Sequence, residues 1–149
     1  MDEHEYQATY QQVNPQVCVF EKALLTQCCD CPQAVHNRIA EREAIGCRSP
    51  QAQNNCTTLL ELLRQNARFV LKMTNPHAPL PHTKALKLQC GGLSGLQQLV
   101  LPEADGDSIQ NVHLLVQRAQ DLYGSLTQIP LPVILQNIAL FEVRPSHKK

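Results

Sequence analysis

The chain lacks tryptophan, and aromatic residues make up only 4% of the sequence. No apolar run approaches the ~20 residues that a membrane-spanning helix requires, so membrane insertion is not expected. The first residues, Met1–Glu5, are acidic and no apolar segment follows them, which argues against a secretory signal. We therefore expect a cytoplasmic protein.

A net charge is also lacking, because 13 basic residues balance 13 acidic ones. Proteins that bind nucleic acids usually carry a basic surplus or a basic patch. The one locally basic stretch, residues 144–149, is typical of a solvated tail, so nucleic-acid binding is not expected. Charged residues make up only 17% of the chain, and glutamines such as Gln97 and Gln117 fall on faces predicted to be exposed. A weakly charged surface of this kind favours a protein partner.

Hydrophobic residues make up 43% of the 149 residues, which is enough for one domain with a buried core. They recur mainly at spacings of three and four, the period of an α-helix. The predicted helices span residues 15–29, 32–46, 50–73, 83–90, 93–101, 109–122 and 133–143. The sequence thus predicts an all-α, single-domain bundle (residues 1–149) of five to seven helices. The last of these segments also fits a strand, although its pattern favours a helix.

Prolines interrupt this pattern at two places, which predicts rigid proline-rich corners at 76–81 and 130–132. The segments 1–12 and 144–149 carry no strong apolar pattern. We expect them to be mobile termini of the domain.

Cysteine, in contrast, is abundant: the chain has seven, and five of them fall between residues 24 and 56. They could form disulfides, bind a metal or an iron–sulfur cluster, act as a redox pair, or fill a helical core. An odd number excludes complete internal pairing. In a reducing compartment, dense cysteines bind metals or catalyse more often than they form bridges. Disulfides are therefore the least favoured explanation.

The predicted helices separate the cysteines into two groups. Cys28 continues an apolar helical stripe and Cys18 lies within the same helix, so both are interpreted as core thiols. The others lie at helix ends, return toward them, or precede a Gly-Gly pair, and we take them as the candidate ligands: Cys29, Cys31, Cys47, Cys56 and Cys90. One objection is geometric, because a straight helix over 32–46 would carry Cys47 roughly 20 Å from Cys31.

Sulfur-rich sites select zinc or iron–sulfur clusters. Structural zinc sites usually show two close cysteine pairs, whereas a cluster tolerates scattered ligands because each cysteine reaches a different iron. The sequence has one close group and solitary partners, so it favours an iron–sulfur cluster, most of all [4Fe-4S], with zinc as the alternative cofactor. At least three of the five candidate ligands should then face one space.

Catalytic motifs are weak. Cys28 and Cys31 form a Cys-x-x-Cys pair, but no strand–helix–strand pattern surrounds it, as a thioredoxin-like site requires. Lone histidines such as His36, His82 and His113 are more often surface or core residues than partners of a catalytic cysteine. Enzymatic activity is therefore not favoured.

Two functions stay open: an iron–sulfur protein for electron transfer or redox sensing with a protein partner, or a helical protein-interaction module with structural zinc or metal-free reduced cysteines.

Overall fold

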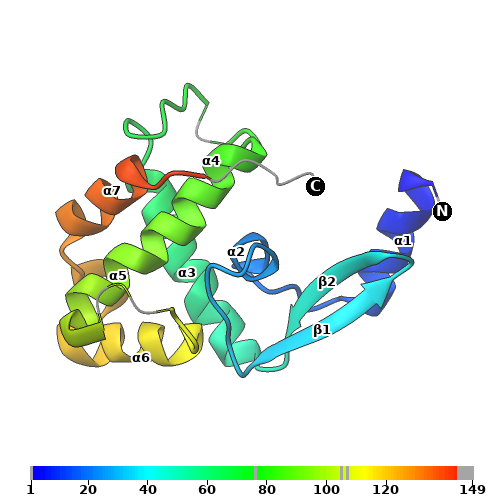
Figure 1. Cartoon of the computed structure of the whole chain (residues 1–149), viewed down its shortest axis with the longest axis horizontal. Coiled ribbons are helices and arrows are strands. Elements are labelled where there is room, and N and C mark those ends of the chain that lie inside the picture. Colours follow the sequence, from blue (N-terminus) through cyan, green and yellow to red (C-terminus); the bar gives the residue numbers. More distant parts are fainter. Residues whose placement is uncertain (1, 76, 105, 107, 144–149) are drawn as a thin grey trace.

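Helices dominate the computed structural model, and a two-stranded antiparallel hairpin lies beside them (Figure 1). The structure describes residues 2–75, 77–104, 106 and 108–143. Its α-helices are α1 (Glu3–Val13), α2 (Glu21–Leu25), α3 (Pro50–Asn66), α4 (His82–Leu86), α5 (Gly92–Val100), α6 (Val112–Tyr123) and α7 (Leu131–Leu140). The hairpin consists of β1 (Ala34–Ile39) and β2 (Arg42–Cys47), and short helical turns are η1 (Lys87–Gly91), η2 (Pro102–Ala104) and η3 (Leu126–Gln128). The mostly helical expectation is confirmed, but the all-α class is wrong because of the hairpin.

Helix α3 begins where the sequence predicts. The Ser49 hydroxyl accepts a hydrogen bond from the Ala52 amide at 3.1 Å, and Pro50 occupies the first turn, where a missing amide proton costs nothing. The helix ends at Asn66 rather than near residue 73. Beyond it the chain continues in turns, and the left-handed backbone of Lys72 (φ 56°) excludes a regular helix there.

Segments α4, η1 and α5 follow one another directly, although the sequence predicts a break at Gly91-Gly92. The glycines serve close packing instead. A Cβ atom at Gly91 would lie 2.7 Å from the Ile138 Cα of α7, and one at Gly95 would lie 2.7 Å from the Ile134 Cα. Because glycine has no Cβ, α5 and α7 approach closely, side by side (Figure 1).

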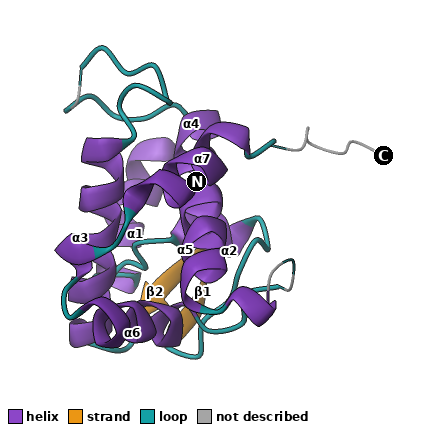
Figure 2. Ribbon diagram, turned by 90° about the vertical axis from the view of Figure 1, so that its left-hand side faces the viewer, coloured by secondary structure: helices purple, strands orange, loops and turns teal. Residues whose placement is uncertain are grey.

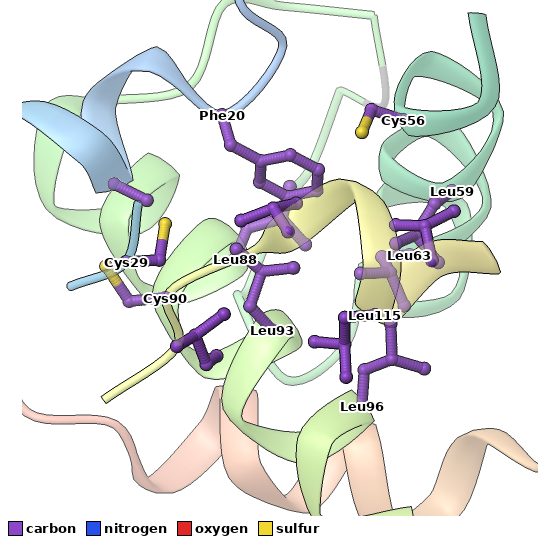
Figure 3. Packing of buried hydrophobic residues seen from close by; sticks show 14 of the residues in the cluster. Phe20, Cys29, Cys56, Leu59, Leu63, Leu88, Cys90, Leu93, Leu96 and Leu115 are labelled. Carbon is purple, nitrogen blue, oxygen red and sulfur yellow. The ribbon is translucent and has the colours of Figure 1, made fainter. Parts of the chain in front are cut away.

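The main core lies among these helices. Figure 3 shows Phe20 reaching from the N-terminal side toward leucines of α3, η1 and α5. Phe20, Leu59 and Leu63 are each at most 1% exposed, and so is Leu96. The cluster therefore joins the two halves of the chain through apolar contact.

The hairpin replaces the helix predicted over 32–46. Its strands pair from Ala34 opposite Cys47 to Ile39 opposite Arg42, and a two-residue turn joins them. Ala44 and Ile45 are buried, and Gly46 lies so close to Asn14 that a side chain would collide with it. Gly46 thus permits a chain crossing and does not end a helix.

Two polar side chains, the buried Asn14 and the half-buried Glu21, fix the hairpin to the N-terminal segment. The Asn14 side-chain amide donates to the Ile45 carbonyl at 3.0 Å. The Glu21 carboxylate accepts from the Ile45 amide at 2.8 Å and from the Tyr10 hydroxyl at 2.9 Å. Burial, together with this bond to Glu21, raises the pKa of Tyr10 to about 12. These bonds tie α1, α2 and β2 together.

The mobility expected for the segments 1–12 and 144–149 stays a prediction, although the structure places a helix in the first of them. Residues within the segment 1–12 form α1, capped by Asp2, and α2 covers only the centre of the helix predicted over 15–29. The predicted mobile segment 144–149 and residue 76 of the first proline corner lie outside the described residues. In the second corner, Pro132 stands in the first turn of α7.

Within the described part of the chain, none of the helices combines the length and the apolar character needed to cross a membrane. Figure 1 places α1 and the hairpin on one side of the molecule and α3 to α7 on the other, and in Figure 2, which is viewed from the helical side, the hairpin lies behind these helices. We call residues 2–49 the N-terminal region and residues 50–143 the helical region.

Candidate functional site

The cysteines gather where the two regions meet. Three of them lie in one loop that follows α2: Cys28, Cys29 and Cys31. The loop is held at both ends, because the Cys28 amide donates to the Ala23 carbonyl at 2.9 Å and the Asp30 amide donates to the Ile109 carbonyl at 2.8 Å. The same short loop therefore presents sulfur atoms from fixed backbone positions.

A disulfide joins Cys28 of this loop to Cys90 of η1, with 6.0 Å between the two Cα atoms. Both earlier interpretations of these residues are wrong: Cys28 is not a free core thiol, and Cys90 is not a metal ligand. An odd number of cysteines excludes complete pairing, but it allows one bridge beside five free thiols. The partner residues are separated by 62 positions, so no local pattern pointed to the bond.

The predicted iron–sulfur cluster is contradicted, and so is the zinc alternative. Among residues 2–75, 77–104, 106 and 108–143, no three His, Cys, Asp or Glu side chains come together in a way that could hold a metal ion. One of the five predicted ligands, Cys90, is consumed by the disulfide, and Cys29 is buried beside Ile109.

The other three predicted ligands do meet. Cys31, Cys47 and Cys56 line one small cavity, together with Cys18, which the sequence assigns to the core. The hairpin removes the geometric objection, since its antiparallel strands bring Cys47 back beside the start of β1. The volume of this cavity, about 20 Å³, is close to that of a single water molecule and leaves no space for a cluster. We call it the thiol cavity.

Thiols in the thiol cavity influence one another. Burial raises the pKa of Cys18 to about 12, against a smaller lowering by a hydrogen bond with the Phe20 backbone, and the nearby Cys47 and Cys31 raise it slightly further. Burial also raises the pKa of Cys56 to about 12, with smaller effects of the same neighbouring cysteines. Burial raises the pKa of Cys29 still further. These three side chains carry almost no thiolate at neutral pH, so they are poor nucleophiles.

Comparison of the chain with protein-family models, curated proteins and solved structures finds no match.

The disulfide borders a second hollow, an open groove of about 600 Å³ that we call the disulfide groove. Cys28 is half-exposed there, whereas Cys90 is only 3% exposed. The Thr26 hydroxyl lies 3.4 Å from the Cys28 sulfur and 4.0 Å from the Cys90 sulfur. It is therefore placed to share a hydrogen bond with either thiol once the bridge opens.

The walls of the disulfide groove are mixed in character. Polar side chains include Ser94 and Ser108, and apolar ones include Leu86, Ile109 and Phe141. Such a lining suits a peptide, whose backbone needs hydrogen-bond partners and whose side chains need apolar contact.

Another polar residue of this groove, Gln97, falls on a face that the sequence predicts to be exposed, yet it is buried.

The three histidines considered above as partners of a catalytic cysteine, His36, His82 and His113, differ in their surroundings. The Nδ1 atom of His36 lies 2.9 Å from a Glu43 carboxylate oxygen on the hairpin surface, and the Nδ1 atom of His82 lies 3.4 Å from the Lys22 amine. His113, at the start of α6, lines the thiol cavity. Its Nδ1 atom is buried and has no hydrogen-bond partner among the described residues. Sequence reasoning considered His113 as a cysteine partner but could not place it.

Proposed function

We propose that this chain is a thiol–disulfide exchange protein that accepts two electrons from a cysteine pair of a protein partner through its Cys28–Cys90 bridge. The observation that carries the proposal is the asymmetry of this bridge. One sulfur, that of Cys28, belongs to a half-exposed residue in an open groove, whereas the other belongs to Cys90, which is only 3% exposed. Exchange begins at a sulfur that the attacking thiolate can reach, and in this bridge that sulfur belongs to Cys28.

The exchange proceeds in two steps with balanced electrons. A thiolate of the partner attacks the Cys28 sulfur, the bond between the two sulfurs breaks, and Cys90 takes the electron pair and a proton. The second thiolate of the partner then attacks the mixed disulfide and releases Cys28 as a thiol. The partner ends as a disulfide and this chain as a dithiol.

The reduced form stays arranged for the reverse reaction. The Gln89 side-chain carbonyl accepts a hydrogen bond from the Ala23 amide at 3.1 Å, so α2 remains attached to η1 without the bridge. The released Cys90 thiol lies in an apolar core, where a free cysteine behaves as a small hydrophobic residue. The two sulfurs therefore remain near each other after reduction.

A protein partner fits the disulfide groove better than a small thiol alone. The groove extends past the bridge along Phe141–Val143, where the backbone after α7 is extended (Phe141 φ −64°, ψ 128°). Its lining combines polar and apolar side chains, which a peptide on either side of a cysteine can use. We therefore assign the partner as a protein with two nearby cysteines on an extended segment.

The test uses two matched variants of the full chain, Cys90→Ser and Cys28→Ser. Each is incubated with a short peptide whose single cysteine is activated as an aromatic disulfide, and the adduct is located by mass spectrometry. We expect the Cys90→Ser variant to form an adduct at Cys28 rapidly, while the Cys28→Ser variant leaves Cys90 unmodified until it is unfolded. Equal rates at the two positions would contradict the proposed asymmetry.

The wild-type chain supplies the second readout. Incubation of the folded chain with a reduced two-cysteine peptide should oxidise the peptide, and alkylation after an acid quench and unfolding should then find two more thiols per chain. A bridge that the peptide reduces only after the chain has been unfolded would be a purely structural clamp, and the proposal would fail.

A further inference from the structure

The thiol cavity is chemically separate from the disulfide groove, and its four thiols take no part in the exchange described above. They come from four parts of the chain: Cys18 precedes α2, Cys31 lies in the loop between α2 and β1, Cys47 ends β2, and Cys56 belongs to α3. Four thiols, each able to be oxidised, therefore lie close together. They differ in exposure and in pKa, and these properties decide which of them can react.

Two of the four are poorly suited to begin a reaction. Cys56 is buried, and the raised pKa values of Cys18 and Cys56 keep both protonated at neutral pH. The remaining two, Cys31 and Cys47, are both half-exposed.

The backbone brings Cys31 and Cys47 toward the same residue. Ala34 is the direct strand partner of Cys47, and its amide donates to the Cys31 carbonyl at 3.0 Å, which closes a tight turn. One more contact holds Cys47 in place, because its thiol lies 3.2 Å from the Ser49 carbonyl and donates to it. Both side chains then face the thiol cavity on either side of Ala34.

A base is present at the same place. The Nδ1 atom of His113 is buried, has no hydrogen-bond partner among the described residues, and belongs to a residue that lines the thiol cavity. An unpaired imidazole nitrogen of this kind can take up the proton of a thiol that comes within hydrogen-bond distance.

We propose that the thiol cavity is a second dithiol site, in which a low-molecular-weight disulfide oxidises Cys31 and Cys47 to a bridge and His113 accepts the proton of the attacking thiol. Cys31 attacks the external disulfide and forms a mixed disulfide while one external thiolate leaves. Cys47 then attacks the Cys31 sulfur, the new bridge forms, and the second external thiolate leaves. The two protons of the cysteines end on the two released thiols, so electrons and protons balance.

The new bridge would tie the loop after α2 to the end of β2. Because Cys28 lies on that same loop, the state of the thiol cavity would be transmitted to the disulfide groove over three residues of chain. This inference does not depend on the proposed exchange at Cys28, since the two sites use different cysteines.

The experiment treats the full-length chain with oxidised glutathione and counts free thiols by alkylation after unfolding. We expect the count to fall from five to three, with the lost pair mapped to Cys31 and Cys47. Trypsin places Cys47 alone in the peptide 43–48. The new bridge should join this peptide to the peptide 23–38, which the Cys28–Cys90 bond already links to the peptide 88–118. Fragmentation then distinguishes Cys31 from its two neighbours.

Matched variants test the assignment. Cys31→Ser and Cys47→Ser should each abolish the new bridge, whereas Cys18→Ala, a change in the same cavity, should leave it intact. A bridge that persists in either serine variant, or oxidation that stops at a glutathione adduct on Cys31, would overturn the proposal. Because each serine variant tests the pair independently, failure of one to fold leaves the other as the test.

The role of His113 has its own readout. In His113→Gln the side chain stays polar but cannot take up a proton, and the second bridge should form about 100-fold more slowly, the lower range for a positioned base. Retention of the wild-type far-ultraviolet circular dichroism shows that the fold is kept. An unchanged rate would remove His113 from the site.

Discussion

The N-terminal region and the helical region are held together by different forces. In the helical region, apolar residues such as Leu59, Leu96 and Ile138 are buried completely and pack against one another. In the N-terminal region, Phe20, Leu24 and Ile45 join that main core, whereas α1 packs on the hairpin through a small separate cluster of Tyr6, Ile39 and Ala44 and through polar bonds. Apolar packing needs only shape and volume, whereas the polar bonds of Asn14 and Glu21 need fixed partners. The region with the smaller core is the one that depends on specific atoms.

Removing the disulfide should have the largest effect, because the bond links the two regions. The double variant Cys28→Ser/Cys90→Ser no longer closes the loop between these residues, which releases entropy in the unfolded chain. For a loop of this length we expect a loss of about 4 kcal/mol in the free energy of unfolding. Denaturation in urea with and without a reductant measures it. Equal stability of the reduced and oxidised wild-type chains would show that the two regions cohere without the bond.

Truncation of core residues should have the next largest effect, and its cost should differ between the two regions. Leu59→Ala empties a site in the main core and should cost about 3 kcal/mol, within the range for buried leucines. Ile39→Ala in the small cluster should cost about 2 kcal/mol, since fewer neighbours surround it. Urea denaturation of both variants tests this order. The comparison of the regions breaks down if Ile39→Ala proves the more costly change.

The polar bonds of the N-terminal region are probed by Glu21→Gln. The amide keeps the shape of the side chain but loses the charge that strengthens the bonds from Ile45 and Tyr10, for an expected cost of about 1.5 kcal/mol. The pKa of Tyr10 should also fall from about 12, although burial keeps it above the ordinary value. Ultraviolet titration of the tyrosines follows that shift. A Tyr10 pKa that does not move would show that Glu21 has no electrostatic role.

Alkaline pH should destabilise the junction of the two regions. The pKa values of Cys18 and Cys56 rise from 9.0 to about 12 in the folded chain, so the folded state retains protons that the unfolded state loses above pH 9. Stability is therefore complete below pH 9 and decreases as the pH rises toward 12, by about 1 kcal/mol per thiol at pH 10. Urea midpoints measured without oxygen at pH 7 and pH 10 test this. The loss should be smaller in Cys56→Ala, which has one buried thiol fewer.

The smallest effect is expected at the surface of the helical region. Phe69 follows α3 and is 90% exposed, so Phe69→Ser removes almost no buried area. The free energy of unfolding should change by less than about 0.5 kcal/mol. A larger loss in thermal denaturation would mean that this side chain is covered in solution.

The same contrast explains what the sequence could predict. Helix α3 follows from Ser49, Pro50 and a stripe of leucines, all of which act within a few residues. The hairpin was missed because Ala34, Val35 and Ile39 also fit helical spacing, and because its position depends on Asn14 and Glu21, which are distant in the sequence.

In the candidate site, too, features set by residues close in the sequence could be predicted, and features set by distant residues could not. The grouping of Cys31, Cys47 and Cys56 could be suspected from their density, although the metal inferred from it was wrong. The pairing of Cys28 with Cys90 could not be predicted, because it arises only when α2 packs against η1. The histidine that faces the thiols could not be chosen from three candidates, since only the packing of α6 brings His113 to the cavity.

The bridge between Cys28 and Cys90 also turns part of the chain into a covalent ring that encloses the hairpin and α3. A protease that cuts once inside the ring, for example in the turns around Phe69, leaves two fragments that are still joined. Such a nicked molecule would keep its full mass until a reductant separates the pieces. In a cell, the two fragments of a chain cleaved in this stretch would stay linked while the bridge is oxidised. Reduction of the bridge would remove this covalent link, so the fragments could separate.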